Sequence, residues 1–378
     1  MVFPKKRITY IDNLKILLIS LVIVGHVSVT YGLVGFWYYY ERTVSASSII
    51  LTFFTSFLQT FLIGFFLFLA AYFIPQSYSR KGPGKYLTGR LKRLGIPLIF
   101  YILFIGPLVL YLHELVINKN NIDFFKFYWK TIIKNGIINV GPLWFLEVLL
   151  IFTITYLILR QITDTMKTEK KKKAATFPSN SQIFLFIIII SLLSFTIRIW
   201  FPVTSTVGTL QLSFLIQYIA LFSIGILTYH HNWLEKITAR IASFWLWITL
   251  IALPFWLLLA FFSKALSGDL SLIGGGLHWQ SLAYSFWENI VGIGIIINLV
   301  YLFRKKFNHQ NKLLKIVSKS TYAALIIHPL ILVPLSYLLR GINLDPLVKF
   351  LLVTITGIPL CFLFGNYIRK IPGLKSML

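Results

Sequence analysis

The sequence is poor in cysteine and in acidic residues, and each shortage excludes a type of protein. A single cysteine, Cys361, stands among the 378 residues, so neither a disulfide framework nor a cysteine metal cluster can form. Only 12% of the residues are charged, roughly half the share of an average soluble domain. The seven histidines have no metal-binding spacing, and Gly-rich phosphate loops and G-x-S-x-G elbows are absent. We therefore expect no metal ion.

Apolar residues make up 57% of the chain and occur in blocks of about 20, the length that crosses a bilayer. They predict an all-α integral membrane protein, a polytopic bundle of about ten transmembrane helices forming one domain, 1–378. The first block follows a basic stretch, as in a signal peptide, but it contains Asp12 and Lys15 and lacks a clear cleavage site. We interpret it as a retained helix. The ten segments are 12–35, 49–73, 94–117, 143–160, 182–201, 210–229, 242–262, 282–303, 321–339 and 346–368.

The positive charges alternate between the two sides of this bundle. Of the 36 Lys and Arg, 26 fall at the termini and in the loops after even-numbered segments, and 9 on the other side. The positive-inside rule then places both termini in the cytoplasm, and we expect a multi-pass protein of the cell inner (plasma) membrane. The net charge of +25 therefore reflects loops that meet membrane lipids, such as the run 170–173, and not a nucleic-acid surface.

Ionisable residues inside the apolar segments are costly to bury and mark candidate functional positions. These residues are Lys15, His26, Glu147, Glu288 and His328, with Arg198 as a weaker candidate. Lys15 and His26 are 11 residues apart, which places them on nearly the same helical face and about 16 Å apart along the axis. That span is comparable to the arm joining the nucleotide of CoA to its sulfur. A snorkelling lysine and a hydrogen-bonded core histidine are the structural alternative.

A basic loop leads into the third segment, where Arg90 and Arg93 share a face of an α-helix. A pair of guanidinium groups suits phosphate recognition, whereas the positive-inside rule alone also explains a basic loop. Glu147 and Glu288 lie near the predicted depth of His26, so we expect them to orient its ring or to contact an acceptor. A buried histidine with such a partner can accept the proton of an attacking hydroxyl.

Several of these stretches resemble the acyltransferase-3 family of membrane enzymes. The stretch 7–15 with Gly25-His26 resembles the family's first helix, which has a basic residue, ten residues and then histidine. Residues 90–97 resemble its Arg-x-x-Arg motif. The family's later motifs are similar to Trp144 with Glu147 and to Ser320-Thr-Tyr322 with His328. The resemblance covers the whole chain and is nearest to the glucan biosynthesis protein C branch.

The resemblance implies an O-acyltransferase that takes an acyl group from cytoplasmic acyl-CoA, acetyl-CoA or succinyl-CoA. Asp12, Lys15, Arg90 and Arg93 would hold CoA around one cavity leading to His26. His26 would be the general base or the acyl carrier, with Glu147 and Glu288 beside it. Trp144, Arg198, Tyr322 and His328 would contact substrate.

The acceptor implied is a hydroxyl of a sugar, glycan or lipid-linked saccharide at the outer side. Many relatives carry an extracellular domain, so a separate extracytoplasmic partner protein is expected for any second step. Lys15 replaces the family's commoner arginine, and Ala70-Ala71 replaces a small residue followed by glycine. A transporter of a solute or lipid-linked sugar, with the buried charges as a relay, is the alternative function, although the chain has no internal repeat. A membrane sensor with purely structural charges is a third.

Overall fold

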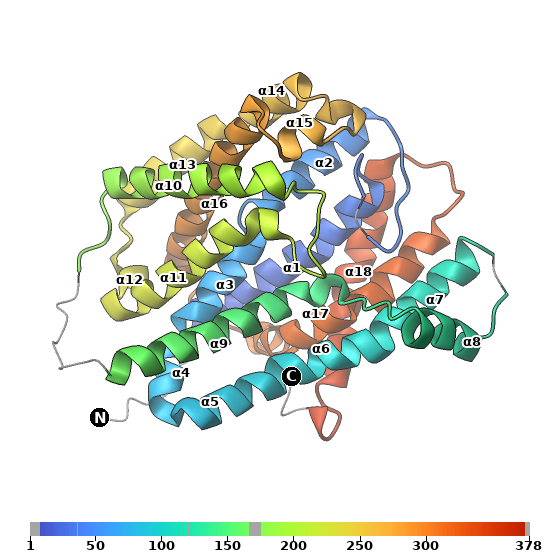
Figure 1. Ribbon diagram of the computed structural model, residues 1–378, viewed down its shortest axis with the longest axis horizontal. Helices are drawn as coiled ribbons and strands as arrows, with labels where there is room; N and C mark the ends of the chain where they lie inside the picture. Colours follow the sequence, from blue (N-terminus) through green and yellow to red (C-terminus); the bar gives the residue numbers. More distant parts are fainter. Residues whose placement is uncertain (1–7, 36, 120, 166–174, 375–378) are drawn as a thin grey trace.

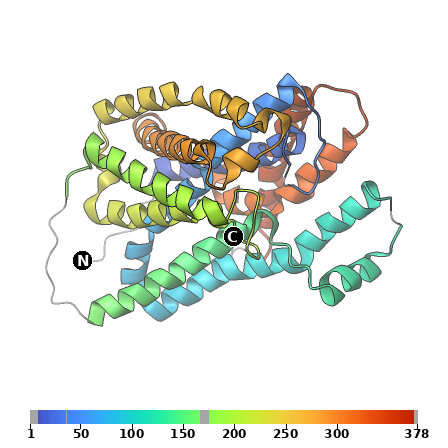
Figure 2. The same ribbon diagram turned by 45° about the horizontal axis from the view of Figure 1, so that its top comes forward.

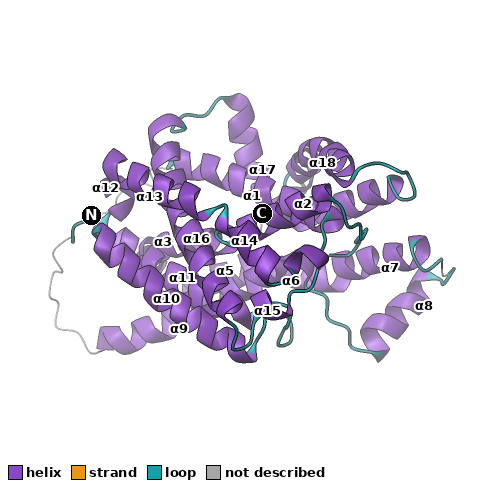
Figure 3. Ribbon diagram, turned by 90° about the horizontal axis from the view of Figure 1, so that it is seen from above, coloured by secondary structure: helices purple, strands orange, loops and turns teal. Residues whose placement is uncertain are grey.

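The computed structural model describes residues 8–35, 37–119, 121–165 and 175–374. These residues form helices and connecting loops, with no β-strand among them (Figure 3). Ten helical stretches are long and apolar enough to cross a membrane, which confirms the predicted fold class. The basic residues Lys5, Lys6 and Arg7 and the run 170–173 lie outside the described residues. The ten spans are Thr9–Tyr31, Ala46–Lys81, Pro83–Val116, Gly141–Thr163, Asn180–Trp200, Leu212–His231, Ala239–Phe262, Trp279–Lys306, Lys312–Leu338 and Pro346–Ile368.

Several spans are divided into shorter helices, labelled in Figure 1. The helices are α1 (Thr9–Tyr31), α2 (Ala46–Gln59), α3 (Leu62–Tyr72), α4 (Ile74–Lys81), α5 (Pro83–Arg90), α6 (Ile96–Phe100), α7 (Gly106–Val116), α8 (Phe124–Tyr128), α9 (Trp144–Thr165), α10 (Asn180–Trp200), α11 (Leu215–His231), α12 (Trp233–Lys236), α13 (Ala239–Ala252), α14 (Phe255–Phe262), α15 (Ser271–Gly274), α16 (Trp279–Lys306), α17 (Lys312–Leu338) and α18 (Pro346–Ile368). Short π-helical turns are η1 (Leu91–Gly95), η2 (Tyr101–Ile105) and η3 (Trp129–Lys134). The 3-10 turns are η4 (Gly141–Leu143), η5 (Leu212–Phe214) and η6 (Ala265–Ser267).

The first helix, α1, runs through the middle of the bundle (Figure 1). It packs against α2, α16, α17 and α18, and about half of its most apolar stretch is buried inside the protein. Its start is tied to the loop after α16, where Asn13 donates to the carbonyl oxygens of Phe307 (2.7 Å) and His309 (2.8 Å). We call this the inner end of the bundle and the opposite one the outer end, after the orientation that the loop charges predict.

The second span is broken in its middle, at Thr60 and Phe61, where the sequence predicts one continuous helix over 49–73. The break frees the carbonyl of Thr60, which accepts a hydrogen bond of 2.9 Å from the side chain of Gln217 on α11. Gly292 of α16 lies against the same carbonyl, where a Cβ atom would overlap it. A broken helix is tolerated at membrane depth when its polar backbone is buried in protein, as it is here.

The packing of α3 against α11 is close, although α3 has Ala70-Ala71 where the family often has a glycine. The small residue is on the opposite helix: Gly225 of α11 faces Ala71 and the backbone of Phe68. A Cβ atom on Gly225 would overlap the Phe68 carbonyl oxygen. Small residues let membrane helices approach closely, and here α11 supplies the small residue, Gly225.

The end of the third span, α7, and the two short helices that follow it before the fourth span, α8 and η3, form an arm at the outer end. Figure 2 shows this arm set apart from the rest of the bundle. Phe125, Trp129 and Ile133 recur every four residues along α8 and η3 and are 78%, 65% and 54% exposed. The adjacent positions 126, 130 and 134 are exposed lysines, so the arm has an apolar stripe beside a basic one.

Candidate active site

The centre of the candidate site is the imidazole of His26, about three-quarters of the way along α1. The ring stacks on Trp37 with a centroid separation of 3.9 Å and on His328 at 5.1 Å, with interplanar angles of 18° and 21°. Trp37 and His328 are in turn nearly parallel, 5.7 Å apart. His26 is only partly buried, because it also lines an internal cavity. One side of the imidazole is thus held by rings while the ring remains accessible from the cavity.

His328 is fully buried in α17, and the proline that follows it explains its orientation. Pro329 has no N–H, so the carbonyl of Leu325, four residues earlier, loses its helical partner. Nδ1 of His328 takes that place at 2.6 Å from the Leu325 oxygen. A carbonyl only accepts, so Nδ1 carries the hydrogen and Nε2 presents a lone pair. Nε2 has no hydrogen-bond partner among the described residues.

Trp37 belongs to the loop between α1 and α2, which folds back over His26. Its neighbour Tyr38 anchors this loop: the Tyr38 hydroxyl lies 2.7 Å from that of Tyr101 and donates to Asn139 at 2.9 Å. Burial raises the pKa of the Tyr38 phenol above its usual value, so the hydroxyl stays neutral. Gly141, with φ +46°, packs against both tyrosine hydroxyls, where a Cβ atom would overlap them.

Charge holds the same loop at its far end. Glu41 forms an ion pair with Lys349 of α18, whose side chain is almost fully buried. Tyr39 stacks edge-on against Tyr337 of α17, with ring centroids 4.9 Å apart.

Sequence reasoning missed Trp37 and Tyr38, since they lie between two spans in a stretch without periodicity. The only signal was the cluster of aromatic residues at 37–40.

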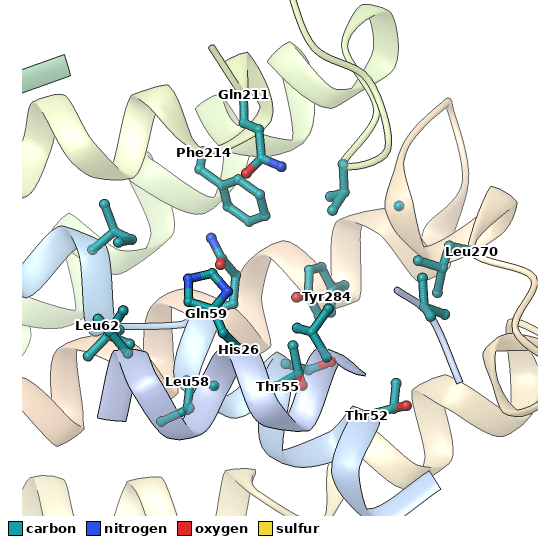
Figure 4. Close-up of a pocket in the computed structure, with 18 of the residues that line it drawn as sticks. His26, Thr52, Thr55, Leu58, Gln59, Leu62, Gln211, Phe214, Leu270 and Tyr284 are labelled. Atoms are coloured by element: carbon teal, nitrogen blue, oxygen red, sulfur yellow. The ribbon is translucent and has the colours of Figure 1, made fainter. Parts of the chain in front are cut away.

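The cavity beside His26 has a volume of about 270 Å³. Its wall includes residues on both sides of the α2–α3 break, such as Gln59 and Leu62, and residues from loops at the outer end, such as Gln211 and Leu270. Figure 4 shows His26, Gln59, Phe214 and Tyr284 gathered around it. Trp144, which the sequence analysis assigned to substrate binding, also lines it. Within the described part of the chain, His26 is the only ionisable residue in this wall apart from Tyr284, and no lysine, arginine or carboxylate lines it.

Glu288 is in the core, but its partner is not His26. One carboxylate oxygen lies 2.5 Å from a guanidinium nitrogen of Arg198, and both side chains are almost completely buried. Arg198 also donates to Ser285 at 3.0 Å and to the Ser213 carbonyl at 3.2 Å. Phe214 and Tyr284 lie over the guanidinium, with centroids 5.1 and 5.3 Å away. Arg198 is therefore placed just behind two residues of the cavity wall.

Glu147 also has a partner of its own, because its carboxylate accepts a 2.6 Å hydrogen bond from Thr209 in the loop before η5. Neither acid makes a hydrogen bond or ion pair to His26 within the described residues. We therefore correct the expectation that one of them orients the ring. In a low-dielectric interior a carboxylate binds a guanidinium more strongly than a neutral imidazole, so Glu288 pairs with Arg198. Aromatic rings take the orienting place beside His26.

The basic residues assigned to CoA lie toward the inner end. Lys15 is 3.6 Å from Asp12 and lies over the ring of Phe73 at the end of α3. Arg90 donates to the Tyr86 hydroxyl at 3.0 Å. Tyr322 of α17 donates to the backbone oxygen of Arg93 at 2.6 Å, which joins α17 to η1.

The turn that contains Arg93 is π-helical, so the α-helical spacing assumed for Arg90 and Arg93 does not apply there. π-Helical turns occur often at functional sites. The cavity lined by His26 does not include Lys15, Arg90 or Arg93 in its wall, contrary to the expectation of one cavity shared by all four. The cations and this cavity are therefore distinct parts of the site.

Comparison with known proteins gives one result that covers nearly the whole chain. A family model described as an acyltransferase domain matches residues 8–366, from the residue before α1 to the last turn of α18. No curated protein and no solved structure matches the chain. The match includes nearly all of each stretch whose motif resembled this family and of the ten spans; only Arg7 and residues 367–368 of those stretches lie outside it. The chain belongs to the acyltransferase-3 family, and it is a multi-pass membrane acyltransferase.

Proposed function

We propose that this enzyme moves an acetyl or succinyl group from acyl-CoA at the inner end to a hydroxyl of a sugar, glycan or lipid-linked saccharide at the outer end. The proposal includes an orientation with both termini in the cytoplasm and a place in the cell inner (plasma) membrane. The observation that carries it is the position of His26. Its ring forms part of the wall of a cavity that reaches the outer loops, on the same helix as Lys15 at the inner end.

His26 acts on the acceptor hydroxyl in this proposal. Its free nitrogen takes the hydroxyl proton while the oxygen forms a bond to the acyl carbonyl carbon. The bond from that carbon to the CoA sulfur breaks, and the proton passes to the sulfur. A two-step route through acyl-His26 has the same balance. Stacking on Trp37 and His328 supports the role, because a general base must be held in one orientation.

The inner-end cations are assigned to the CoA phosphates. Lys15, Arg90 and Arg93 supply positive charge there, and Asp12 holds the Lys15 ammonium. Tyr322 fixes the backbone of η1, which favours a constant position for Arg93. Guanidinium groups suit phosphate oxygens, since their planar donors match two acceptors at once.

The outer-end cavity is assigned to the acceptor. Trp144 and Tyr284 offer aromatic faces, and Gln59 and Gln211 offer amide groups that both donate and accept hydrogen bonds. Glu147, one turn along α9 from Trp144, stays a candidate for contact with the acceptor. The likeness to the glucan biosynthesis protein C branch favours a glucan among the possible acceptors. A separate extracytoplasmic partner protein would carry out any later step.

The test uses purified protein in lipid nanodiscs and membranes from cells that produce it. We expect His26→Ala to bind labelled acyl-CoA as the parent does, and to incorporate no label into the carbohydrate fraction of membranes. Arg93→Ala should weaken CoA binding by about tenfold, the size of one lost charged hydrogen bond. Arg240→Ala, which removes an exposed arginine elsewhere at the inner end, is the control and should bind normally.

Full transfer by His26→Ala would refute the assignment of that residue. Equal weakening by Arg93→Ala and Arg240→Ala would show that net charge, and not a CoA site, determines binding. Counterflow of a labelled solute in vesicles free of acyl-CoA, with no transfer in any preparation, would favour a transporter instead.

A further inference from the structure

The wall of the His26 cavity combines neutral polar groups with apolar ones and has no fixed charge. Its polar members are the side chains of Thr52, Thr55, Ser56, Gln59, Gln211 and Tyr284. Among the residues that the structure describes, no lysine, arginine, aspartate or glutamate is part of the lining. A substrate group that carried a charge into this space would find hydrogen-bonding partners but no counter-ion.

The nearest cation cannot serve as that counter-ion without a large cost. Arg198 lies behind Phe214 and Tyr284, and its side chain has no exposed surface. Its guanidinium is already paired with Glu288, whose other carboxylate oxygen has no hydrogen-bond partner among the described residues. Turning Arg198 toward the cavity would leave the Glu288 carboxylate buried and unpaired, which is strongly destabilising.

The chemistry of acyl transfer places the acyl chain in this cavity. The carbonyl carbon must lie beside His26, with the CoA sulfur toward the inner end and the acceptor hydroxyl toward the outer end. Trp37 and His328 cover one side of the imidazole, so the remaining substituent of that carbon extends into the cavity. The acyl chain therefore shares about 270 Å³ with the hydroxyl that attacks it.

We propose that the transferred group is short and uncharged, acetyl rather than succinyl. A succinyl group ends in a carboxylate, which would lose its water in this cavity without gaining a cation, whereas an acetyl methyl group has no such loss. This inference rests on the proposed function and narrows it to one class of donor. In this proposal, the uncharged wall around Gln59 and Gln211 determines which acyl-CoA the enzyme uses as donor.

The closing experiment compares the two donors on the same membranes. Label from acetyl-CoA and from succinyl-CoA is followed into the carbohydrate fraction, and the signal of His26→Ala membranes is subtracted from each. We expect transfer from succinyl-CoA to be slower by about tenfold or more, because an unpaired buried charge costs more than one lost hydrogen bond. Binding of both donors to the nanodisc protein should be similar, because the CoA part is identical.

A designed change at Gln211 tests the cause. Figure 4 shows this side chain directed toward the cavity from the loop before η5. Gln211→Lys adds a cation and should raise the succinyl-to-acetyl ratio by about tenfold. Gln211→Met, of nearly the same length but neutral, should keep the succinyl-to-acetyl ratio of the parent even where total transfer falls, because both donors lose the same amide group. Thermal unfolding of both variants identifies any loss of folded protein.

The outcomes are distinct. Equal or faster transfer from succinyl-CoA by the parent protein would overturn the inference and leave the proposed function standing. No His26-dependent transfer from either donor would overturn the proposed function and the inference with it. An equal ratio in Gln211→Lys and Gln211→Met, both folded, would show that charge in this cavity does not select the donor.

Discussion

His328 and Pro329 are consecutive in α17, and the proline makes available the hydrogen bond that orients the histidine ring. The proline removes one helical hydrogen bond, and the histidine uses the freed Leu325 carbonyl to fix its ring. That contact keeps His328 in one tautomer and in a stacked position against His26. A helix that loses a backbone bond thereby gains an oriented side chain in its interior.

Replacement of this proline tests the coupling. In Pro329→Ala the new N–H competes with His328 for the Leu325 carbonyl, so we expect the ring to lose its anchor. His26-dependent transfer should fall by about tenfold, the equivalent of one hydrogen bond. Pro334→Ala removes the other interior proline of α17 and is the matched control. Similar activity in the two variants would show that the Leu325 contact is irrelevant to transfer.

At this scale the sequence predicted which polar residues gather in the core but not how they pair. His26, His328, Glu288 and Arg198 were identified because ionisable groups are rare inside apolar segments. The pairing of Glu288 with Arg198 depends on how α10 and α16 pack, which helical periodicity alone does not determine. Trp37 was not identified, because an aromatic residue in a loop has no pattern that marks it.

The apolar blocks predict where the helices lie, but they do not predict where a helix breaks or continues beyond its apolar block. All ten spans were predicted, with ends within a few residues for most of them. The break at Thr60 was missed because the groups that accommodate its free carbonyl, the Gln217 side chain and Gly292, lie far away in the sequence. The second span also continues to Lys81 through α4, beyond the apolar block that predicted it.

The arm formed by α8 and η3 carries an element-scale prediction. Its exposed apolar stripe, Phe125, Trp129 and Ile133, beside a lysine stripe is typical of a helix that lies in a membrane interface. A fluorophore attached at Phe125→Cys should shift to the blue on reconstitution into vesicles. The same label at Lys126→Cys, one position along, should shift much less. Equal spectra at the two positions would contradict an interfacial arm.

For the whole molecule, the loop charges predict which end faces the cytoplasm. The one cysteine, Cys361, is buried, so single introduced cysteines can report the orientation. Ser79→Cys in the exposed end of α4 should be protected from an impermeant thiol reagent in intact cells, and Ser267→Cys in η6 should react. The parent protein supplies the unlabelled background. The opposite pattern would reverse the orientation and place the cations at the wrong side for cytoplasmic CoA.

The loop that brings Trp37 onto His26 has a consequence for the biogenesis of the enzyme. Helix α1 leaves the ribosome first, yet the groups that hold this loop, Tyr337 and Lys349, and the ring of His328 are among the last to be synthesised. A nascent chain with eight inserted spans therefore has Trp37, but it still lacks His328 and the two groups, Tyr337 and Lys349, that hold the far end of the loop. The stacked arrangement around His26 is thus complete only when the last two spans are in place.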